Sequence, residues 1–231
     1  MQITLGHIDE ALSVTGLLTL GAFHRQASDG VTGGIEGGSL VLVGNAGPEM
    51  WRVFSQSGFD RNASSPLDNW SRQVLGDLAD ILSQRFGLSV QAVFPFDGPP
   101  YQPFQRWAVR SGNAHPSPIG PMIHNTYGLW HAYRGAFLIA AKLEMTVPCE
   151  TSHPCQSCVE KPCLSSCPVE AFSEAGYDVP ACLDYLEKQP GGACLSASCL
   201  ARRACPIGRD YTYAPPHARF HMDKFFKAHR P

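Results

Sequence analysis

Eight of the nine cysteines in this 231-residue chain fall into one stretch, and they form two sets of four. The first set is Cys155, Cys158, Cys163 and Cys167, and the second is Cys182, Cys194, Cys199 and Cys205. Soft thiolate ligands favour iron–sulfur clusters, and each 4Fe–4S cluster takes four of them. The eight cysteines therefore predict two 4Fe–4S clusters with no ligand left over.

The last cysteine of each set directly precedes a proline, Pro168 or Pro206. This pattern resembles that of bacterial two-cluster ferredoxins, in which the cysteine before proline ligates the other cluster. The resemblance implies a crossed assignment. One cluster would be held by Cys155, Cys158, Cys163 and Cys205, and the other by Cys167, Cys182, Cys194 and Cys199. The spacings are looser than in a compact ferredoxin loop, with four residues between Cys158 and Cys163.

Two other uses of the cysteines stay open. Structural zinc sites use similar pairs of cysteines two residues apart, although zinc does not account for the two Cys-Pro ends. Disulfide bonds would require an oxidising compartment, and we find no export signal in the sequence. The ninth cysteine, Cys149, is expected to be a free structural thiol.

Composition and charge narrow the class of protein. The formal net charge is −2 and 44% of the residues are hydrophobic, as expected for a soluble globular chain. Nucleic-acid binding would call for a basic domain or face. The N-terminus has no basic region of the kind that opens a signal peptide, and its apolar run is interrupted by Gly16 and Gly21. We therefore expect a cytoplasmic protein that binds neither nucleic acid nor membrane.

Local patterns predict a mixed set of elements. Apolar residues at helical spacing, with Pro66 at the start and Gly87 at the end, predict a long core helix. Further helices are expected over 8–12, 49–56, 102–112 and from 216 onward, and strands over 15–23, 39–44, 88–96 and 135–144. A change in composition near Val147 divides the chain into a main domain (1–147), a cysteine module (148–210) and a tail helix packed on the main domain (211–231).

A second group of chemically useful residues lies between positions 123 and 135. It offers His124, Tyr127, Trp130, His131 and Arg134. Singly, each is expected to be an ordinary core or surface residue. Their concentration shortly before the first cysteine set instead suggests a loop that faces a cofactor. The glycines at 128 and 135 would let the backbone approach a flat ligand.

These residues carry a resemblance to known families. The stretch 119–138 resembles the core motif of the cobalamin-processing chaperone CblC, with His124, Trp130 and Arg134 at similar positions, and 209–213 resembles a segment near that family's C-terminus. The cysteine module and the turn that begins at Asp97 look instead like epoxyqueuosine reductase. Reductive dehalogenases combine the same two parts.

The resemblance implies an α+β fold: a nitroreductase-like α/β sandwich followed by a small bacterial-ferredoxin-like two-cluster module. It also implies a corrinoid lying over the sheet without a protein histidine on cobalt. His124, Tyr127 and Trp130 would line the corrinoid, and Arg134 matches an arginine that helps CblC bind glutathione. Because nitroreductase-like folds also bind flavin, flavin remains open.

The implied function is that of an oxidoreductase of the cobalamin reductase type. Cobalamin would be its cofactor or substrate, and its reductive activity would remove an upper ligand or activate cobalt. A ferredoxin, flavodoxin or flavin reductase would supply the electrons. Two alternatives remain: an electron carrier that binds no corrinoid, and a short relative of epoxyqueuosine reductase. Asp97 falls where that enzyme keeps a proton-donating aspartate, but it could equally cap the turn before Gly98.

Overall fold

Residues far apart in the sequence share each of the two units into which the chain divides. The computed structural model describes residues 2–35, 37–145, 152–173 and 175–230, so Cys149 lies outside the described part. Unit 1 contains residues 1–113 and 131–151, and unit 2 contains 114–130 and 152–231. The segment 114–130 therefore belongs to the same unit as the cysteines. Arg134, by contrast, lies in unit 1.

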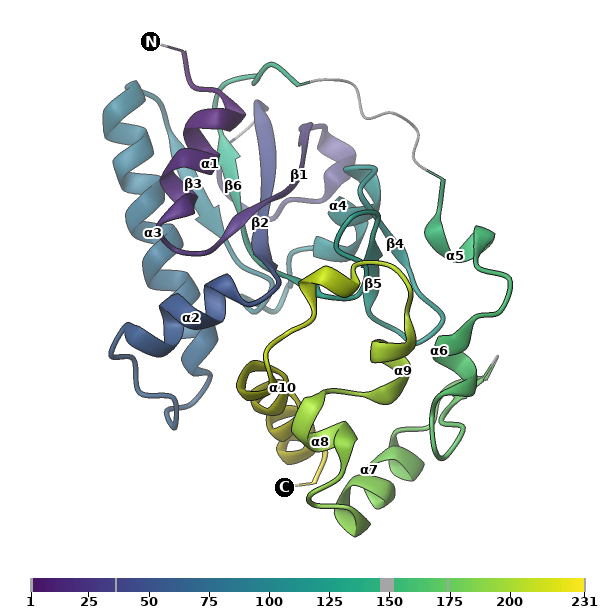
Figure 1. Ribbon diagram of the computed structural model, residues 1–231. Helices are drawn as coiled ribbons and strands as arrows, with labels where there is room; N and C mark the ends of the chain where they lie inside the picture. The colour runs from purple at the N-terminus through teal and green to yellow at the C-terminus, as the bar shows by residue number, and fades with distance from the viewer. Residues whose placement is uncertain (1, 36, 146–151, 174, 231) are drawn as a thin grey trace. The chain divides into compact units, whose positions relative to one another are not determined.

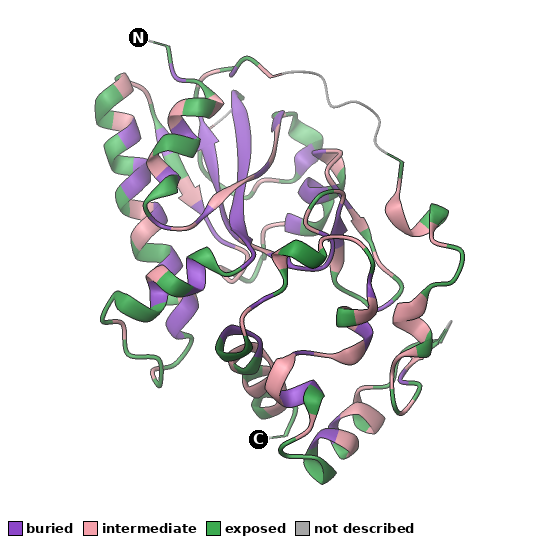
Figure 2. Ribbon diagram, in the orientation of Figure 1, coloured by how far each residue is buried: buried purple, intermediate pink, exposed green. Residues whose placement is uncertain are grey.

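A four-stranded antiparallel sheet forms the centre of unit 1. Its strands are β1 (Leu18–His24), β2 (Ser39–Ala46), β6 (His131–Ile139) and β3 (Val90–Val93), in that order across the sheet. Every residue of β2 is buried, and Figure 2 shows this strand and β6 as the most buried part of the sheet. The apolar run over 40–43 in β2 follows from this position, because a strand covered on both faces favours apolar side chains.

Helices cover the sheet of unit 1. They are α1 (Leu5–Ser13), α2 (Glu49–Gln56), α3 (Pro66–Phe86) and α4 (Phe104–Arg110), with a short 3-10 turn at Ala27–Asp29. The helix α3 runs along β3 and β6, and α1 along β1 (Figure 1). Pro66 occupies the first turn of α3, and Gly87 ends this helix in the left-handed conformation, as the sequence predicts. Among the described residues, neither α3 nor any other helix is long and apolar enough to cross a membrane.

Two strands differ from their predicted ranges. The strand expected over 135–144 is β6, which begins at His131 and ends at Ile139, because its first residues pair with Asn45 and Ala46 of β2. The strand expected over 88–96 is reduced to β3, whose four residues pair with the end of β6. Local patterns missed both limits because the partner strand sets them.

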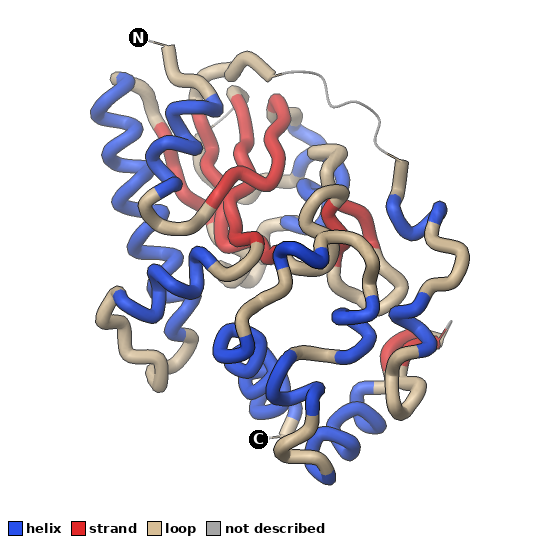
Figure 3. The backbone as a smooth tube through the Cα atoms, in the orientation of Figure 1, coloured by secondary structure: helices blue, strands red, loops and turns tan. Residues whose placement is uncertain are grey.

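Unit 2 consists of short helices joined by loops, together with two small two-stranded hairpins (Figure 3). The hairpins are β4 (Ala114–Pro116) with β5 (Met122–His124), and β7 (Phe172–Ser173) with β8 (Gly176–Tyr177). The helices are α5 (Pro154–Ser157), α6 (Pro162–Ser165), α7 (Val179–Lys188), α8 (Ala193–Ala197), α9 (Leu200–Ala204) and α10 (Pro215–His229), with a 3-10 turn at Arg209–Tyr211.

The tail helix α10 belongs to unit 2. It contacts α8 and α7 of that unit. Its apolar residues Met222, Phe225 and Phe226 pack against the buried Leu186 and Leu195, beside the second set of cysteines. The expected packing of this helix on the main domain stays a prediction.

Candidate metal centres

One group of four thiols surrounds a small cavity in unit 2. Its members come from α5, α6 and the end of α9: Cys155, Cys158, Cys163 and Cys205. We call this the first cysteine group. Apolar residues complete the lining, among them Pro118, Ile123 and Ile207. Cys205 belongs to the second sequence set but lies with three cysteines of the first set. This grouping has the same members as the crossed ligand assignment.

The remaining four described cysteines form the second cysteine group: Cys167, Cys182, Cys194 and Cys199. Three of them line a larger cavity, of about 360 Å³, together with Tyr177 and apolar residues of α10. Cys167 is close enough to the other three to act on their ionisation, since its charge raises the pKa of each of them. It thus lies with cysteines from the other set, as Cys205 does.

Burial makes most of these thiols hard to ionise. Burial, followed by the charges of Cys205, Cys163 and Cys158, raises the pKa of Cys155 to about 11. Burial is also the main cause of the raised pKa of five others: Cys163, Cys182, Cys194, Cys199 and Cys205. Because the thiolate is the form that binds metal, loading these groups must release protons.

Hydrogen-bond donors already point at several of the sulfur atoms. The Ala171 amide donates to Cys167 Sγ at 3.4 Å. Backbone groups of Leu200 and Arg202 bond to Cys194 and Cys199, and the backbone of Ile207 bonds to Cys205. The bonds from Leu200, Arg202 and Ile207 lower the pKa of Cys194, Cys199 and Cys205 and so favour the negatively charged form of these thiols.

The two groups fit a cluster to different degrees. The second cavity has room for a cubane, whereas the first, at about 20 Å³, would require its thiols to move apart. All eight described cysteines are free thiols. Within the described ranges, no three His, Cys, Asp or Glu side chains converge closely enough to hold a single metal ion. The thiols therefore surround cavities and do not converge on a single point. Their assignment as cluster ligands stays a prediction.

The segment 114–130 approaches the first cysteine group through a close backbone contact. Gly128 has a φ of 56°, and a Cβ placed on it would lie 2.0 Å from the carbonyl oxygen of Ile207. Gly208 meets the same contact from the other side, where a Cβ would lie 2.3 Å from the backbone of Tyr127. The close approach expected of Gly128 is therefore to the protein's own chain, two residues after Cys205.

Replacing Gly128 with alanine should weaken this contact. We expect a loss of about 1–3 kcal/mol in stability, because the left-handed backbone and the backbone clash both oppose a Cβ. Thermal unfolding and iron content after reconstitution measure the effect. Gly58→Ala, in unit 1, is the matched control, since Gly58 also has a positive φ, of 77°, but no described atom within 4 Å of an added Cβ. Equal losses in the two variants would show that the clash with Ile207 is unimportant.

Trp130 is part of the core of unit 2. Its side chain is 1% exposed and packs against Tyr213 and Ala218. The guanidinium of Arg202 lies 4.5 Å from the Trp130 ring centroid and 4.7 Å from that of Tyr213. The same side chain donates from Nε to the carbonyl oxygen of Leu129 at 2.9 Å. Since Arg202 also lines the second cavity, it links that cavity to the segment that carries Trp130.

The other predicted corrinoid contacts are also engaged internally. His124 Nδ1 accepts hydrogen bonds from the amides of Thr126 and Tyr127, at 3.1 and 3.3 Å. In unit 1, the buried Arg134 donates from Nε to Asn45 Oδ1 at 3.0 Å. Of the four predicted contacts only Tyr127 is partly exposed, with its ring edge-on to Tyr211. Their role in corrinoid binding stays a prediction.

Asp97 has a partner that the sequence did not reveal. Its carboxylate accepts two hydrogen bonds from the Arg72 guanidinium, one of them from Nη1 at 3.0 Å. That guanidinium lies over the rings of Phe94 and Phe96, at 5.0 and 5.1 Å. The pairing raises the pKa of Arg72. Neither the turn-capping role nor the proton-donating role predicted this ion pair, because Arg72 lies on α3, far away in the sequence.

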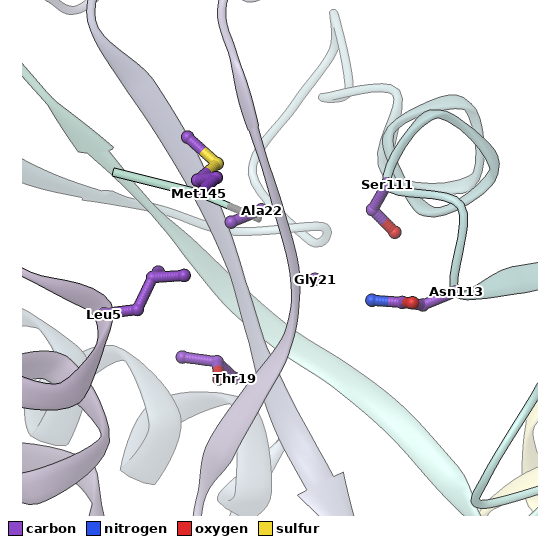
Figure 4. Close-up of a pocket in the computed structure, with 7 residues that line it drawn as sticks. All are labelled: Leu5, Thr19, Gly21, Ala22, Ser111, Asn113 and Met145. Atoms are coloured by element: carbon purple, nitrogen blue, oxygen red, sulfur yellow. The ribbon is translucent and has the colours of Figure 1, made fainter. Parts of the chain in front are cut away.

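A separate cavity of about 230 Å³ lies in unit 1, beside the bulge in β1 (Figure 4). Figure 4 shows Ser111 and Asn113 on one side of Gly21, and Leu5 and Met145 on the other. The described residues of its lining include no carboxylate, thiol or imidazole. These residues offer hydrogen bonds and apolar contact to a ligand.

Comparisons with known proteins show which solved structures share this fold. No protein family matches the sequence, and no curated protein matches it. Among solved structures, the chain is similar to a B12-trafficking protein CblC from C. elegans, with 17% identity and a TM-score of 0.53. That match covers 97% of this chain and 93% of the other.

Epoxyqueuosine reductases are also similar in structure. The enzyme from Streptococcus thermophilus matches with 15% identity and a TM-score of 0.55, over 94% of this chain and 70% of that one. An epoxyqueuosine reductase solved with a tRNA stem loop has 16% identity and a TM-score of 0.47, and this chain spans 65% of its length. At such identities the likeness shows the fold alone. The α+β, nitroreductase-like fold expected from the sequence is thereby confirmed.

Proposed function

We propose that this protein is an electron-transfer oxidoreductase with two 4Fe–4S clusters, and that its substrate is a bound corrinoid. The observation that carries the proposal is the gathering of eight free thiols into two groups of four, each drawing one cysteine from the other sequence set. Bound clusters of this kind supply one-electron steps at low potential.

The chain's own residues would support that role in three ways. The eight thiols would hold the clusters. Backbone donors such as the Ala171 amide would stabilise the charged sulfur atoms. Apolar linings, including Ile123 and Ile207 in one cavity and Leu186 and Phe225 in the other, would keep water away from them. An electron donor of the ferredoxin, flavodoxin or flavin reductase class would complete the system.

Support for a corrinoid substrate comes from the fold, which resembles that of a B12-trafficking protein. One observation favours the second candidate, an electron carrier that binds no corrinoid. His124, Trp130 and Arg134, which we expected to contact the corrinoid, are buried and bonded within their own units. The two candidates share the clusters and differ only in the ligand, so a binding experiment separates them.

The test is an anaerobic titration of cob(II)alamin into the iron-loaded protein, followed by a low-potential electron donor. We expect the cobalamin spectrum to shift on binding and again on reduction. Cys163→Ser should spare binding and abolish reduction. A parent protein that neither shifts nor reduces cobalamin would establish the electron carrier without corrinoid.

Tyr127→Leu provides the sharper test of the predicted contacts. It should weaken cobalamin binding by about 1–3 kcal/mol, the scale of a lost aromatic contact. Trp130→Ala is less informative, because removing a core tryptophan costs about 3–5 kcal/mol of stability. Tyr185→Leu, on α7, is a control for a half-buried tyrosine in the same unit. Unchanged affinity in Tyr127→Leu would remove Tyr127 from the site.

A further inference from the structure

The hydroxyl of Tyr177 is directed at the second cysteine group. Tyr177 lies on β8 and Cys182 on the first turns of α7, five residues later. Both line the cavity of about 360 Å³, and the tyrosine hydroxyl donates a hydrogen bond to Cys182 Sγ. A hydroxyl that donates to a sulfur atom stabilises negative charge on that sulfur.

Aromatic packing fixes the direction of this hydroxyl. The Tyr177 ring is stacked on Phe172, with centroids 4.7 Å apart and planes at 20°. On another side it stacks with Phe225 of α10, at 6.2 Å and 22°. The residue keeps 38% of its surface exposed, and these two stacked rings are the contacts that orient it. A tyrosine hydroxyl is protonated at neutral pH and can therefore act as a donor.

The first cysteine group differs in this respect. Among the residues of its cavity lining that the structure describes, none carries a hydroxyl group, and donors to its sulfur atoms include backbone groups such as that of Ile207. Cationic side chains act on both groups, with Lys161 and Arg209 near the first and Arg203 near the second. The neutral hydroxyl of Tyr177 is therefore a feature that distinguishes the second group from the first.

We propose that Tyr177 is a positioning residue that raises the reduction potential of the cluster held by the second cysteine group. The inference rests on the proposed function, since it requires that cluster to be present. Reduction by one electron from the external donor adds negative charge that spreads onto the sulfur ligands. A hydrogen bond to one of these sulfurs stabilises the reduced state more than the oxidised state, and such bonds are among the determinants of cluster potential. The bond would accordingly favour placement of the electron on the second group.

Tyr177→Phe tests this by removing one oxygen atom and keeping the stacked ring. A redox titration followed by electron paramagnetic resonance, with the iron-loaded full chain, resolves the potentials of the two clusters. We expect one potential to become more negative, by about a tenfold change in the reduction equilibrium, or about 59 mV for one electron. The other potential should not move. Cys167→Ser identifies the affected cluster, because the same potential should be missing from that variant.

Tyr185→Phe is the matched control, since Tyr185 lies on the same helix as Cys182 but is not part of the cavity lining. A second measurement follows the reduced second cluster in heavy water. A rapidly exchanging proton should be coupled to this cluster in the parent protein and in Ser198→Ala, which removes the other hydroxyl of the cavity lining. The same proton should be missing from Tyr177→Phe. This measurement decides the question even where Tyr177→Phe takes up less iron.

The outcomes separate the inference from the proposed function. A fully loaded Tyr177→Phe protein with both potentials unchanged, or with the first cluster shifted, overturns the role of Tyr177 and leaves the clusters in place. Absence of the exchanging proton from the parent does the same. A parent protein that takes up no iron overturns the proposed function and this inference with it.

Discussion

Removing iron should unfold unit 2 and leave the sheet of unit 1 folded. The helices α5 and α6 have four residues each, and α8 and α9 have five. Helices of this length are not stable without tertiary contacts. The buried apolar cluster beside the first cysteine group is small, and Cys205 is itself one of its members. Bonds between thiolates and metal must therefore replace much of the missing core, as they do in small metal-dependent domains.

The measurement is hydrogen exchange read by mass spectrometry before and after chelation. We expect protection to disappear over 152–213 and to persist over β2 and β6, whose backbone bonds lie in the core of unit 1. Protein prepared without air should contain about eight iron and eight sulfide per chain. One or two zinc ions with little iron, or full protection of the cysteine module after chelation, would contradict the cluster assignment.

Replacing Cys167 with serine should remove about half of the iron and expose a specific set of thiols. In the crossed assignment Cys167 completes the second group, so its loss should release Cys182, Cys194 and Cys199. In the uncrossed assignment the released thiols would be those of its own sequence set, Cys155, Cys158 and Cys163. Alkylation of the native protein followed by peptide mass spectrometry distinguishes the two results, because cluster-bound thiolates are protected from the reagent.

Cys205→Ser is the mirror control for this experiment. It should release Cys155, Cys158 and Cys163 and leave the second group protected. Cys149→Ser should leave the iron content unchanged, because eight other cysteines already complete two sets of four. Labelling of all seven remaining cysteines of the two groups in either Cys167→Ser or Cys205→Ser would mean that the two groups do not load independently.

Local signals in the sequence predicted those parts of the fold that local physics decides. Pro66 and Gly87 set the limits of α3, and the apolar run at 39–44 became the buried β2. The cysteines were found because their chemistry is specific and their spacing follows a known pattern. Each of these features depends on residues that are neighbours along the chain.

Contacts between distant residues account for what the sequence could not reveal. Trp130, a predicted corrinoid contact, packs against Tyr213 and Arg202, more than seventy residues later in the chain, and its role in binding stays a prediction. The ion pair between Asp97 and Arg72 could not be foreseen either, because it depends on the packing of α3. The position of Tyr177 beside Cys182 could not be predicted from the sequence, because it depends on the packing of α10 against α7 and α8.

The paired glycines at 128 and 208 constrain how this protein can change during evolution. Each would place a Cβ against the backbone of the segment that carries the other, and both have positive φ angles. A side-chain clash can be relieved by a smaller neighbour, but a clash with backbone has no such remedy. Substitution at one position therefore cannot be rescued by substitution at the other. Homologues that keep this contact should show glycine in both alignment columns together, which gives a simple criterion for recognising distant relatives.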